Sequence, residues 1–262
     1  LGGSAAFAGQ VCRDAVGDAF IADLVAGGVS FVGQQKEGGL ATARSMIFVT
    51  PDGVRSMNTY LGTSLNLTAN HIPADTGASV IYLEGYLFDA PEGPEIFKKA
   101  AEIAQQSDAQ LALSLSDPWC VERHREQISA FIREHVSILF SNEEEVTTLT
   151  GSDRIAAQQE MSAQLDELII TQGADGAVVC CEDAQVSVPA MPEGAVIDTT
   201  GAGDLFAAGY LYGRATGASA LQSAELASLC AGEVICHYGA RPAKPSAHAP
   251  TANFSLADCR RL

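Results

Sequence analysis

The sequence is short of basic residues and contains no long hydrophobic run. Its 262 residues include 32 Asp and Glu against 15 Lys and Arg, which gives a formal net charge of -17. This acidity disfavours nonspecific binding to nucleic acid or to anionic membranes, because both depend on clustered Lys and Arg. No stretch approaches the roughly 18 uninterrupted apolar residues of a membrane-spanning helix, and no secretory signal is recognisable. We therefore expect a cytoplasmic protein with no nucleic-acid or membrane partner.

Cysteine pairs with metal-binding or redox spacing are also missing. The seven cysteines show neither C-x-x-C nor Cys/His spacing typical of zinc sites. Their odd number argues against a complete set of intramolecular disulfides, so reduced and mostly buried thiols are expected. A hydrophobic content of 47% over this length is typical of one large domain with a well-buried core.

What the sequence does contain is a glycine-rich run, D-T-T-G-A-G-D, from Asp198 to Asp204. Val196 and Ile197 are expected to end a buried strand, the glycines to form a tight turn, and Leu205 to begin an apolar helix. Glycine lets the backbone approach a ligand closely. The unpaired N–H groups and the dipole of a first helical turn favour a phosphate group or developing negative charge.

Asp204 has two interpretations at this position. A carboxylate in the first turn can simply stabilise the helix, or it can accept a proton from a hydroxyl group that attacks a bound phosphate. A dinucleotide-binding G-x-G-x-x-G motif is disfavoured because Phe206 occupies its third position, although a looser variant would use Ala207. A Walker loop is excluded, since G-x-x-x-x-G-K-[ST] does not occur.

The run strongly resembles the D-T-x-G-A-G-D signature of the ribokinase-like (PfkB) carbohydrate and nucleoside kinases. Further stretches resemble other motifs of this family and follow in the family's order: Leu1 to Ala6, Asn142 to Glu145, Thr171 to Gly176, and Tyr238 to Pro242. The chain is identified as a member of the family, nearest in appearance to the adenosine kinase group. The resemblance implies an ATP-dependent, Mg²⁺-requiring kinase that acts on a hydroxymethyl group of a nucleoside or a simple sugar.

Two rivals stay open beside this assignment. One is an NAD(P)-linked oxidoreductase, against which Phe206 argues. The other is a nucleotide-binding regulator without turnover, against which the joint presence of Asp204, Asn142 and Glu145 argues. In the kinase, the resemblance makes Asp204 the catalytic base and the backbone N–H groups of Gly201, Ala202 and Gly203 an anion hole.

The resemblance also assigns residues to the nucleotide, the metal and the acceptor. Glu145 and Asn142 would organise Mg²⁺ through its waters. In isolation N-capping and helix charge are the favoured explanation of S-N-E-E-E, and the order of the motifs reverses this preference. His237 has the alternative of an ordinary helix-end partner. The implied nucleotide contacts are Asn142, Thr171, Gly173, Gly176, His237 and Gly239; the acceptor contacts are Gly2, Gly3, Ser4, Glu84 and Thr200; and Asp198 and Thr200 are the positions for a possible K⁺.

The pattern along the chain predicts an α/β protein with three layers, a mostly parallel central sheet and a small antiparallel β lid. We expect residues 1–28 to start the large domain, 29–62 to form the lid and 63–262 to complete the large domain. The expected strands are 42–49, 55–60, 80–83, 111–115, 138–140, 168–170, 177–180 and 185–188. The expected helices are 95–106, 121–134, 156–165, 204–214 and 221–237.

The start of the chain does not fit the family pattern. Gly3 to Ala6 should open a helix, yet Phe7 to Val11 already has the pattern of the next strand. The family's upstream Asp and the Asn expected after Ala6 are absent from the sequence. These observations predict that residues are missing before Leu1 and between Ala6 and Phe7.

The acceptor is the least determined part of the prediction. The G-G-S start, the segment Arg55 to Gly62 and the segment Glu233 to Pro242 resemble adenosine kinases. Lid residues such as Met57 and Tyr60 suit a flat base, whereas a bare sugar calls for more hydrogen-bonding groups. We therefore expect a purine nucleoside, with a simple sugar as the alternative, and a possible homodimer through the lid.

Overall fold

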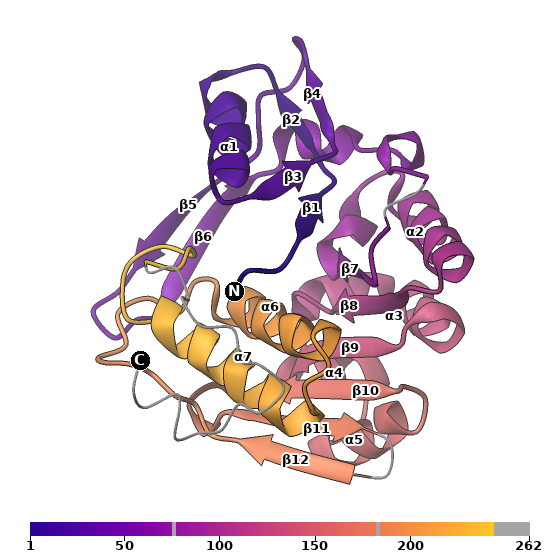
Figure 1. The fold of residues 1–262 in the computed structure, drawn as a ribbon, viewed down its shortest axis with the longest axis vertical. Helices are drawn as coiled ribbons and strands as arrows, with labels where there is room; N and C mark the ends of the chain where they lie inside the picture. Colours follow the sequence, from indigo (N-terminus) through magenta and orange to yellow (C-terminus); the bar gives the residue numbers. More distant parts are fainter. Residues whose placement is uncertain (75–76, 182–183, 244–262) are drawn as a thin grey trace.

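The protein is built around one six-stranded sheet (Figure 1). The computed structural model describes residues 1–74, 77–181 and 184–243. The strand order is β12 (Ala184–Val188), β11 (Ala177–Cys181), β10 (Glu167–Thr171), β9 (Ile138–Asn142), β8 (Gln110–Ser114) and β7 (Val80–Glu84). Strands β7 to β10 are parallel, and β11 and β12 continue the sheet as an antiparallel edge. The mostly parallel α/β sheet predicted from the sequence is confirmed.

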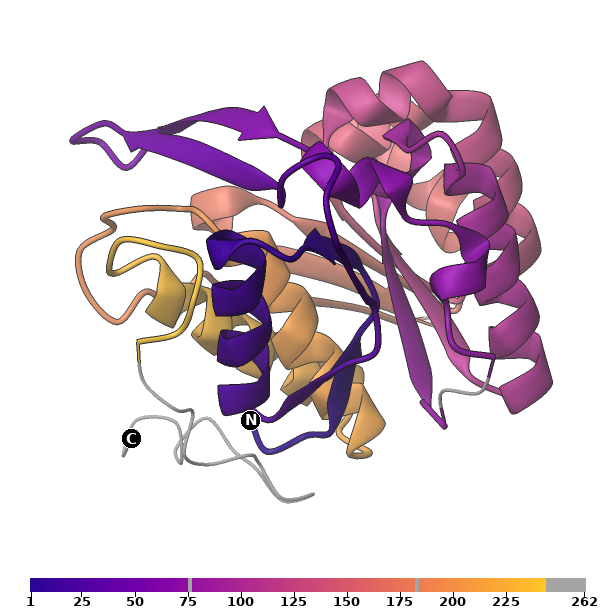
Figure 2. The ribbon, with the colours of Figure 1, turned by 90° about the horizontal axis from the view of Figure 1, so that it is seen from above.

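Helices cover both faces of this sheet. One face packs against α2 (Gly93–Ser107), α3 (Pro118–His135), α4 (Glu143–Thr150) and α5 (Arg154–Ser162), and the other against α6 (Ala202–Ala215) and α7 (Ala220–Val234). Figure 2 shows these layers from above. Leu113 and Leu139 point to the first face, while Ala112 and Ile138 point to the second. Burial on both faces explains why these strands are almost continuously apolar.

The N-terminal segment forms short strands beside the large sheet. Strand β1 (Ala5–Phe7) pairs with β3 (Val29–Phe31), and β2 (Gln10–Cys12) with β4 (Gln34–Lys36), both in parallel. Residues from Gly3 to Ala6 therefore do not open a helix, and that prediction is wrong, because Ala5 and Ala6 pair as strand residues with Val29 and Ser30. These pairings also join strands on the two sides of the predicted boundary at residue 29.

Helix α1 (Ala15–Ala26) follows β2 and was not predicted. Asp14 begins it as an N-cap, accepting a hydrogen bond from the Gly17 N–H at 2.8 Å. The same carboxylate accepts bonds from the Thr42 N–H and hydroxyl group. A uniformly apolar helix with a weak polar face gives little 3.6-residue periodicity, which is why the sequence pattern missed it.

The predicted antiparallel hairpin is present as β5 (Arg44–Val49) and β6 (Arg55–Tyr60). Alternate residues of the hairpin point to opposite faces. The inner face consists of three cross-strand pairs: Ser45 with Thr59, Ile47 with Met57, and Val49 with Arg55. The outer face consists of the other three: Arg44 with Tyr60, Met46 with Asn58, and Phe48 with Ser56. The hydrogen-bonded hydroxyl groups of Ser45 and Thr59 lie on the inner face, and Arg44 lies over the Tyr60 ring on the outer face. The two faces therefore have different surroundings.

Two boundaries near the signature run differ from expectation. Val196 and Ile197 do not end a buried strand: they lie in an irregular segment and are 45% and 36% exposed. This segment is held by hydrogen bonds from the Ile197 and Asp198 N–H groups to one acceptor, the Ile235 carbonyl, rather than by a strand ladder. Helix α7 ends at Val234, three residues before the predicted end at His237.

Short 3₁₀ helices complete the chain: η1 (Gly62–Asn66), η2 (Ala69–His71), η3 (Gly85–Asp89) and η4 (Gly173–Asp175). Helix η3 follows β7 directly, and one residue separates η4 from the end of β10. Among the described residues, no helix has the length and apolar character needed to cross a bilayer.

Candidate active site

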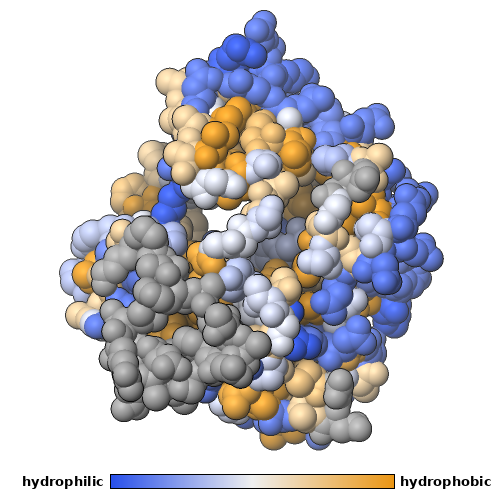
Figure 3. Space-filling view, in the orientation of Figure 1, coloured by the Kyte–Doolittle hydropathy of each residue, from blue (hydrophilic) through white to orange (hydrophobic). Residues whose placement is uncertain are grey.

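The predicted site residues gather at one edge of the central sheet. Glu84, Asn142 and Thr171 are the last residues of β7, β9 and β10. Parallel strands end at a common edge, where open α/β sheets bind ligands. Figure 3 shows a hollow at the centre of this face of the molecule, between the N-terminal strands and the region of α6. The site is thus an open depression between the large sheet and the N-terminal elements.

The signature turn is held in shape by the buried carboxylate of Asp198. Its Oδ1 accepts hydrogen bonds from the Thr200 N–H at 2.9 Å and from the Thr200 hydroxyl at 2.6 Å. Its Oδ2 accepts a bond from the Gly239 N–H at 3.0 Å. Burial alone would raise the pKa of Asp198, but these hydrogen bonds hold it below its ordinary value. The carboxylate therefore joins the turn to the loop that contains Gly239.

Gly201 is required by the geometry of this turn. Its φ is +82°, a left-handed conformation, and a Cβ there would lie 2.9 Å from the Cα of Ala240. Gly203 differs, because a Cβ on it would meet nothing within 4 Å. The chain is thus packed against the loop that contains Ala240 at Gly201, and it faces open space at Gly203.

The start of α6 is left open to a ligand. Its N-cap, Gly201, provides no side-chain hydrogen bond. The Ala202 N–H makes only a long bond of 3.3 Å to the Thr199 carbonyl, and the first regular helical bond runs from the Leu205 N–H to Gly201. The N–H groups of the first turn and the helix dipole therefore present positive potential toward the hollow.

Asp204 stands in this first turn with exposed surface. Even so, partial desolvation by the surrounding atoms raises its pKa, while the positive charge of Arg55 opposes the rise. Asp204 in turn contributes to the raised pKa of Glu84, for which burial is the main cause. These couplings bring carboxylates from β7 and α6 and a guanidinium from β6 into one site.

Arg55 is a site residue that the sequence prediction missed. Its Nη1 donates a hydrogen bond of 2.7 Å to the Thr199 hydroxyl, within the signature turn. Thr199 also donates to the carbonyl of Gly53 in the hairpin turn, at 3.4 Å. The signal available in the sequence was one of three basic residues in the predicted lid. Its partner is 144 residues away, so no local pattern announced the contact.

Glu84 lies in a hydrogen-bonded network at the end of β7. Its Oε1 accepts a bond of 2.6 Å from the Tyr82 hydroxyl, and its Oε2 accepts one of 2.5 Å from the Ser116 hydroxyl. Ser116 has a left-handed φ of +70° and its Oγ accepts a bond from the Gly85 N–H. The network fixes the Glu84 carboxyl in a half-buried position near Asp204.

Asn142 and Glu145 form a complete capping box at the start of α4. The Asn142 Oδ1 accepts a bond from the Glu145 N–H at 2.8 Å, and the Glu145 Oε2 accepts one from the Asn142 N–H at 2.9 Å. The helix-capping interpretation weighed for these residues is therefore realised in the structure. It does not exclude a second role, because the carboxylate oxygens keep unused lone pairs.

The region around Glu145 is the part of the site best suited to a cation. Burial raises the pKa of Glu145 to about 7, with further contributions from the negative charges of Asp117, Glu84 and Glu144. Asp117 is the N-cap of α3, at the end of the next strand along the sheet edge. Hard carboxylate oxygens concentrated in this way are the ligands that Mg²⁺ prefers, and a bound cation would relieve their repulsion.

The remaining predicted nucleotide residues are placed as follows. Thr171 ends β10, with its hydroxyl 3.4 Å from the Ser141 carbonyl. Gly173 has a φ of +58°, and a Cβ on it would meet nothing within 4 Å, whereas a Cβ on Gly176 would clash with the Val188 carbonyl. Gly176 therefore has a structural reason to be glycine, while Gly173 leaves room at the surface.

His237 lies beyond the end of α7 and pairs with the chain around it. Its Nε2 is 3.5 Å from Glu233 Oε1, and its Nδ1 is 3.2 Å from the Tyr238 carbonyl. The ordinary pairing expected as the alternative is met at Nδ1, whereas the buried Nε2 has no hydrogen-bond partner. Gly2, Gly3 and Ser4 are exposed, and a Cβ on Gly3 would lie 3.0 Å from the Tyr212 ring, two turns after Asp204 on α6.

Comparison with known proteins agrees with this geometry. The model of the pfkB family carbohydrate kinases matches residues 1–247. An uncharacterized sugar kinase from Archaeoglobus fulgidus is 28% identical over 248 residues, which cover 94% of this chain and 96% of that protein.

Two solved structures are similar over nearly the whole chain. The adenosine kinase from Sinorhizobium meliloti has a TM-score of 0.90 and 38% identity, covering 100% of this chain and 78% of that one. A probable sugar kinase from Rhizobium etli has a TM-score of 0.89 and 41% identity, covering 93% of this chain and 75% of that one. With the signature turn, the sheet and the family match all in agreement, the chain belongs to the pfkB family of carbohydrate kinases, which are phosphotransferases.

Proposed function

We propose that this protein is an ATP-dependent, Mg²⁺-requiring kinase that transfers the γ-phosphate of ATP to the hydroxymethyl group of a purine nucleoside such as adenosine. One observation carries the proposal: the Asp204 carboxylate stands in the first turn of a helix whose N-terminus is open, beside Arg55. A carboxylate at this position repels a bound phosphate, so its presence at a phosphate site calls for a role in the reaction. The role that its position allows is to accept a proton from the attacking hydroxyl group.

In the reaction, Asp204 accepts the proton of the acceptor hydroxyl as the oxygen attacks the γ-phosphorus and the bond to the leaving ADP oxygen breaks. The backbone N–H groups of Gly201, Ala202 and Gly203 stabilise the negative charge on the transferring group. Arg55 adds a positive charge from the hairpin, within reach of Thr199. Catalysis then rests on alignment and electrostatics, as expected for phosphoryl transfer.

The nucleotide is proposed to lie along the sheet edge toward α7. Thr171 and Gly173 would contact the phosphates, and Gly176 would shape the turn beneath them. His237 and Gly239 would border the base, where the Gly239 N–H is already tied to Asp198. Because the overall charge of -17 repels a nucleotide at long range, local N–H groups and a cation must compensate it.

The metal is proposed to lie near Glu145, with Asn142 acting through water. Mg²⁺ bound there would neutralise charge on the phosphate oxygens. Asp198 and Thr200 stay the proposed positions for a monovalent cation such as K⁺. The Asp198 carboxylate already accepts three hydrogen bonds, so an ion would use only its remaining lone pairs.

The acceptor is proposed to bind between Gly2, Gly3, Ser4, Glu84 and Thr200, under the hairpin as a lid. The hairpin face that carries Arg55 also carries Ile47 and Met57, which suit the flat, apolar surface of a base. Tyr60 lies on the opposite face, so we do not propose that it covers the base. The 38% identity with an adenosine kinase over the whole chain supports a nucleoside. The similarly related probable sugar kinase keeps a simple sugar as the alternative.

The acceptor is tested by comparing kcat/KM for adenosine, inosine, guanosine, ribose and fructose, with ADP release as the readout. We expect adenosine to exceed each free sugar by about tenfold or more, equivalent to roughly 1.4 kcal/mol of transition-state binding. If a free sugar exceeds adenosine by that factor, the nucleoside proposal is wrong and the kinase assignment stands.

The outer hairpin face is proposed to pair with a second copy of the chain. It carries Met46 at 59% exposure, Phe48 at 64% and Tyr60 at 41%, a concentration of exposed apolar side chains on one two-stranded sheet. Light scattering after size exclusion should report a dimer, and Phe48→Ser should shift it toward the monomer. A wild-type monomer at high protein concentration would contradict the proposal.

A further inference from the structure

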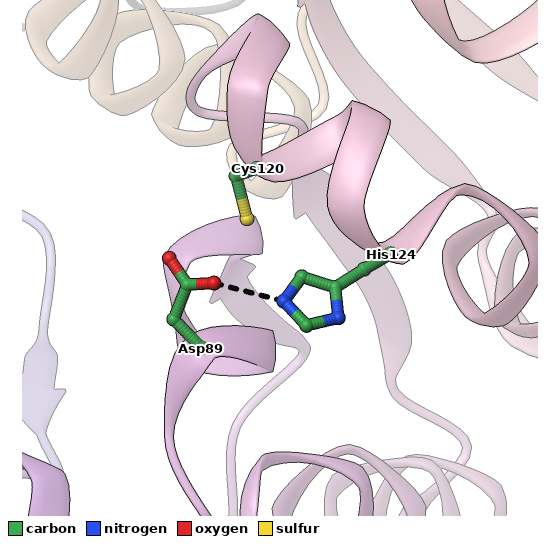
Figure 4. A group of neighbouring side chains, drawn as sticks. All are labelled: Asp89, Cys120 and His124. Atoms are coloured by element: carbon green, nitrogen blue, oxygen red, sulfur yellow. Dashed lines mark hydrogen bonds and ion pairs between the residues drawn. The ribbon is translucent and has the colours of Figure 1, made fainter.

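Three side chains with metal-binding donor atoms meet on the face of the sheet that is covered by α2 to α5, opposite the face that packs against α6. They are Asp89 at the end of η3 and Cys120 and His124 in α3 (Figure 4). One donor atom from each residue lies within 4.8 Å of the other two. It is the one such group found among the described residues of the chain. The active-site proposal gives these three residues no role.

We propose that Asp89, Cys120 and His124 form a zinc-binding site. Cys120 and His124 are four residues apart in α3, so their side chains project from one face of the helix. Asp89 approaches from a different element and supplies an oxygen donor. Thiolate, imidazole and carboxylate together are a ligand set typical of Zn²⁺ rather than Mg²⁺ or Ca²⁺, and three protein ligands leave the fourth tetrahedral position to water.

The spacing of the three residues explains why sequence analysis found no zinc motif. A C-x-x-x-H pair lacks the second cysteine or histidine of the usual motifs, and the third ligand is contributed from 31 residues before Cys120, on another element. Asp89 comes close to the other two residues only when the chain is folded.

The geometry needs a small adjustment to accept a metal. The Asp89 Oδ1 and His124 Nε2 atoms are 2.8 Å apart and share a hydrogen bond. Zinc bonds of about 2.0–2.1 Å at a tetrahedral angle require roughly 3.3 Å between these two atoms, so the pair must open by ~0.5 Å. The ion would replace the shared proton, and the Cys120 thiol would lose its own proton to solvent.

The existing contacts are compatible with that exchange. The Cys120 thiol donates to the Gly85 carbonyl at 3.3 Å. Arg123 donates to both Asp89 oxygens, at 3.1 and 2.6 Å. The Cys120–Gly85 bond is lost when the thiol gives up its proton. The Arg123 bonds can persist as outer contacts that orient the carboxylate, because each oxygen has two lone pairs. The Nδ1 of His124 is 3.3 Å from Gln127 Oε1, which can orient the ring in the same way.

Local backbone structure and burial favour these positions. His124 has non-helical dihedral angles inside α3, φ -118° and ψ 19°, and its ring stacks on Phe88 with centroids 5.9 Å apart. Cys120 is fully buried, whereas the side chains of Asp89 and His124 keep 26% and 22% of their surface exposed. An ion therefore has a route from solvent through the carboxylate and the imidazole to a buried sulfur.

The site would join two elements that border the active site. Helix η3 begins directly after Glu84, and α3 begins directly after Asp117. A zinc ion bridging Asp89 to Cys120 and His124 would fix the start of α3 against η3. The inference rests on these residues alone and does not depend on the proposed acceptor or on the kinase reaction.

The test uses Co²⁺ as a spectroscopic replacement for Zn²⁺ on the purified, metal-stripped and reduced protein, with excess Mg²⁺ to occupy carboxylate sites. We expect one Co²⁺ per chain, tetrahedral d–d bands and a thiolate-to-cobalt charge-transfer band, all displaced by Zn²⁺. Carboxylate sites contain no sulfur and cannot produce the charge-transfer band. Absence of that band from the wild-type protein would overturn the proposal without recourse to any variant.

Variants then locate the site. Cys120→Ser should abolish the charge-transfer band, and His124→Asn should weaken Co²⁺ binding by about tenfold or more. Cys12→Ser is the matched control, since Cys12 is another buried thiol, on β2. Thermal unfolding without metal checks that each variant is folded. A folded Cys120→Ser protein that keeps the band, or a loss of the band in Cys12→Ser, would place the metal elsewhere and contradict the assignment.

Discussion

Helices α4 and α6 start at the same edge of the sheet but finish their N-termini in opposite ways. At α4, Asn142 and Glu145 satisfy each other's backbone N–H groups in a capping box. At α6, Gly201 supplies no cap, and the first turn faces open space at Gly203. Both helices carry an acid in the first turn, Glu145 and Asp204.

The difference shows that an acidic residue in a first helical turn has no fixed meaning. Glu145 is buried and its oxygens complete the cap. The lone pairs that these oxygens do not use for capping can bind a cation. Asp204 takes no part in capping its own helix, so its carboxylate is available to a ligand. We therefore propose that the same residue class serves opposite charges at two helix starts, and four tests examine this contrast.

The largest effect is expected from Asp204→Asn. The substitution keeps the shape of the side chain but removes the proton acceptor, so turnover should fall by roughly 10²- to 10⁴-fold. ATP affinity, measured by calorimetry, should be retained or improved because a negative charge has left the anion site. Turnover near that of the wild-type protein would make Asp204 an ordinary first-turn charge.

The second test separates the two glycines of the open start. Gly201→Ala forces a left-handed φ of +82° on alanine and brings its Cβ against Ala240, so thermal unfolding should show a loss of about 1–3 kcal/mol. Gly203→Ala meets no such clash and should fold as well as the wild-type protein. Its methyl group should instead raise the KM for ATP. Equal destabilisation by both changes would contradict the described turn.

The third test concerns the capped start of α4. The pKa of Glu145 is raised from 4.5 to about 7, so the folded protein binds this proton more tightly than the unfolded chain does. Without divalent cations, the free energy of unfolding should therefore fall as pH rises from about 4.5 to about 7, by on the order of 3 kcal/mol. Glu145→Gln keeps a capping side chain and should remove most of this fall.

Glu145→Gln should also raise the Mg²⁺ concentration needed for half-maximal rate, since it weakens the hard-oxygen ligand set. Glu144→Gln is the control, because Glu144 is exposed in the same turn. Chemical denaturation across pH and a Mg²⁺ titration of initial rate measure the two effects. An unchanged Mg²⁺ requirement in Glu145→Gln would leave this residue with capping alone.

The smallest effect is expected from Arg55→Gln. Arg55 lowers the pKa of Asp204, so its removal should move the acidic limb of the kcat/KM profile to higher pH, by roughly half a pH unit. Arg44→Gln on the outer hairpin face should leave the limb in place. A limb that moves equally in both variants would attribute the shift to the hairpin as a whole.

The sequence predicted the large domain well because its signals are local. Buried parallel strands such as Leu168 to Ile170 are short apolar runs between turns, and the amphipathic helices between them have a clear period. The glycine-rich signature placed the start of α6 within two to three residues, because closely spaced glycines mark a turn and an apolar run follows them. The carboxyl ends of the strands then put Glu84, Asn142 and Thr171 at one edge.

The failures arose where distant contacts decide the structure. Val196 and Ile197 are apolar, yet their backbone is held by a single carbonyl of the segment after α7 rather than by a neighbouring strand. Arg55 reaches Thr199 only because the hairpin turn packs against the irregular segment before the signature. Asp89 meets Cys120 and His124 only because η3 packs on α3. None of these partners is close in sequence.

The bond between Asp198 and Gly239 has a consequence for protein engineering. The carboxylate holds the loop after α7 against the signature turn, and Gly201 packs against Ala240 in the same contact. If this loop were replaced by the loop of a relative, different side chains would lie against Gly201. Exchanges should therefore take residues 196–203 and 235–243 as one cassette, and chimaeras that split the cassette are expected to lose the anion hole along with the intended change of specificity.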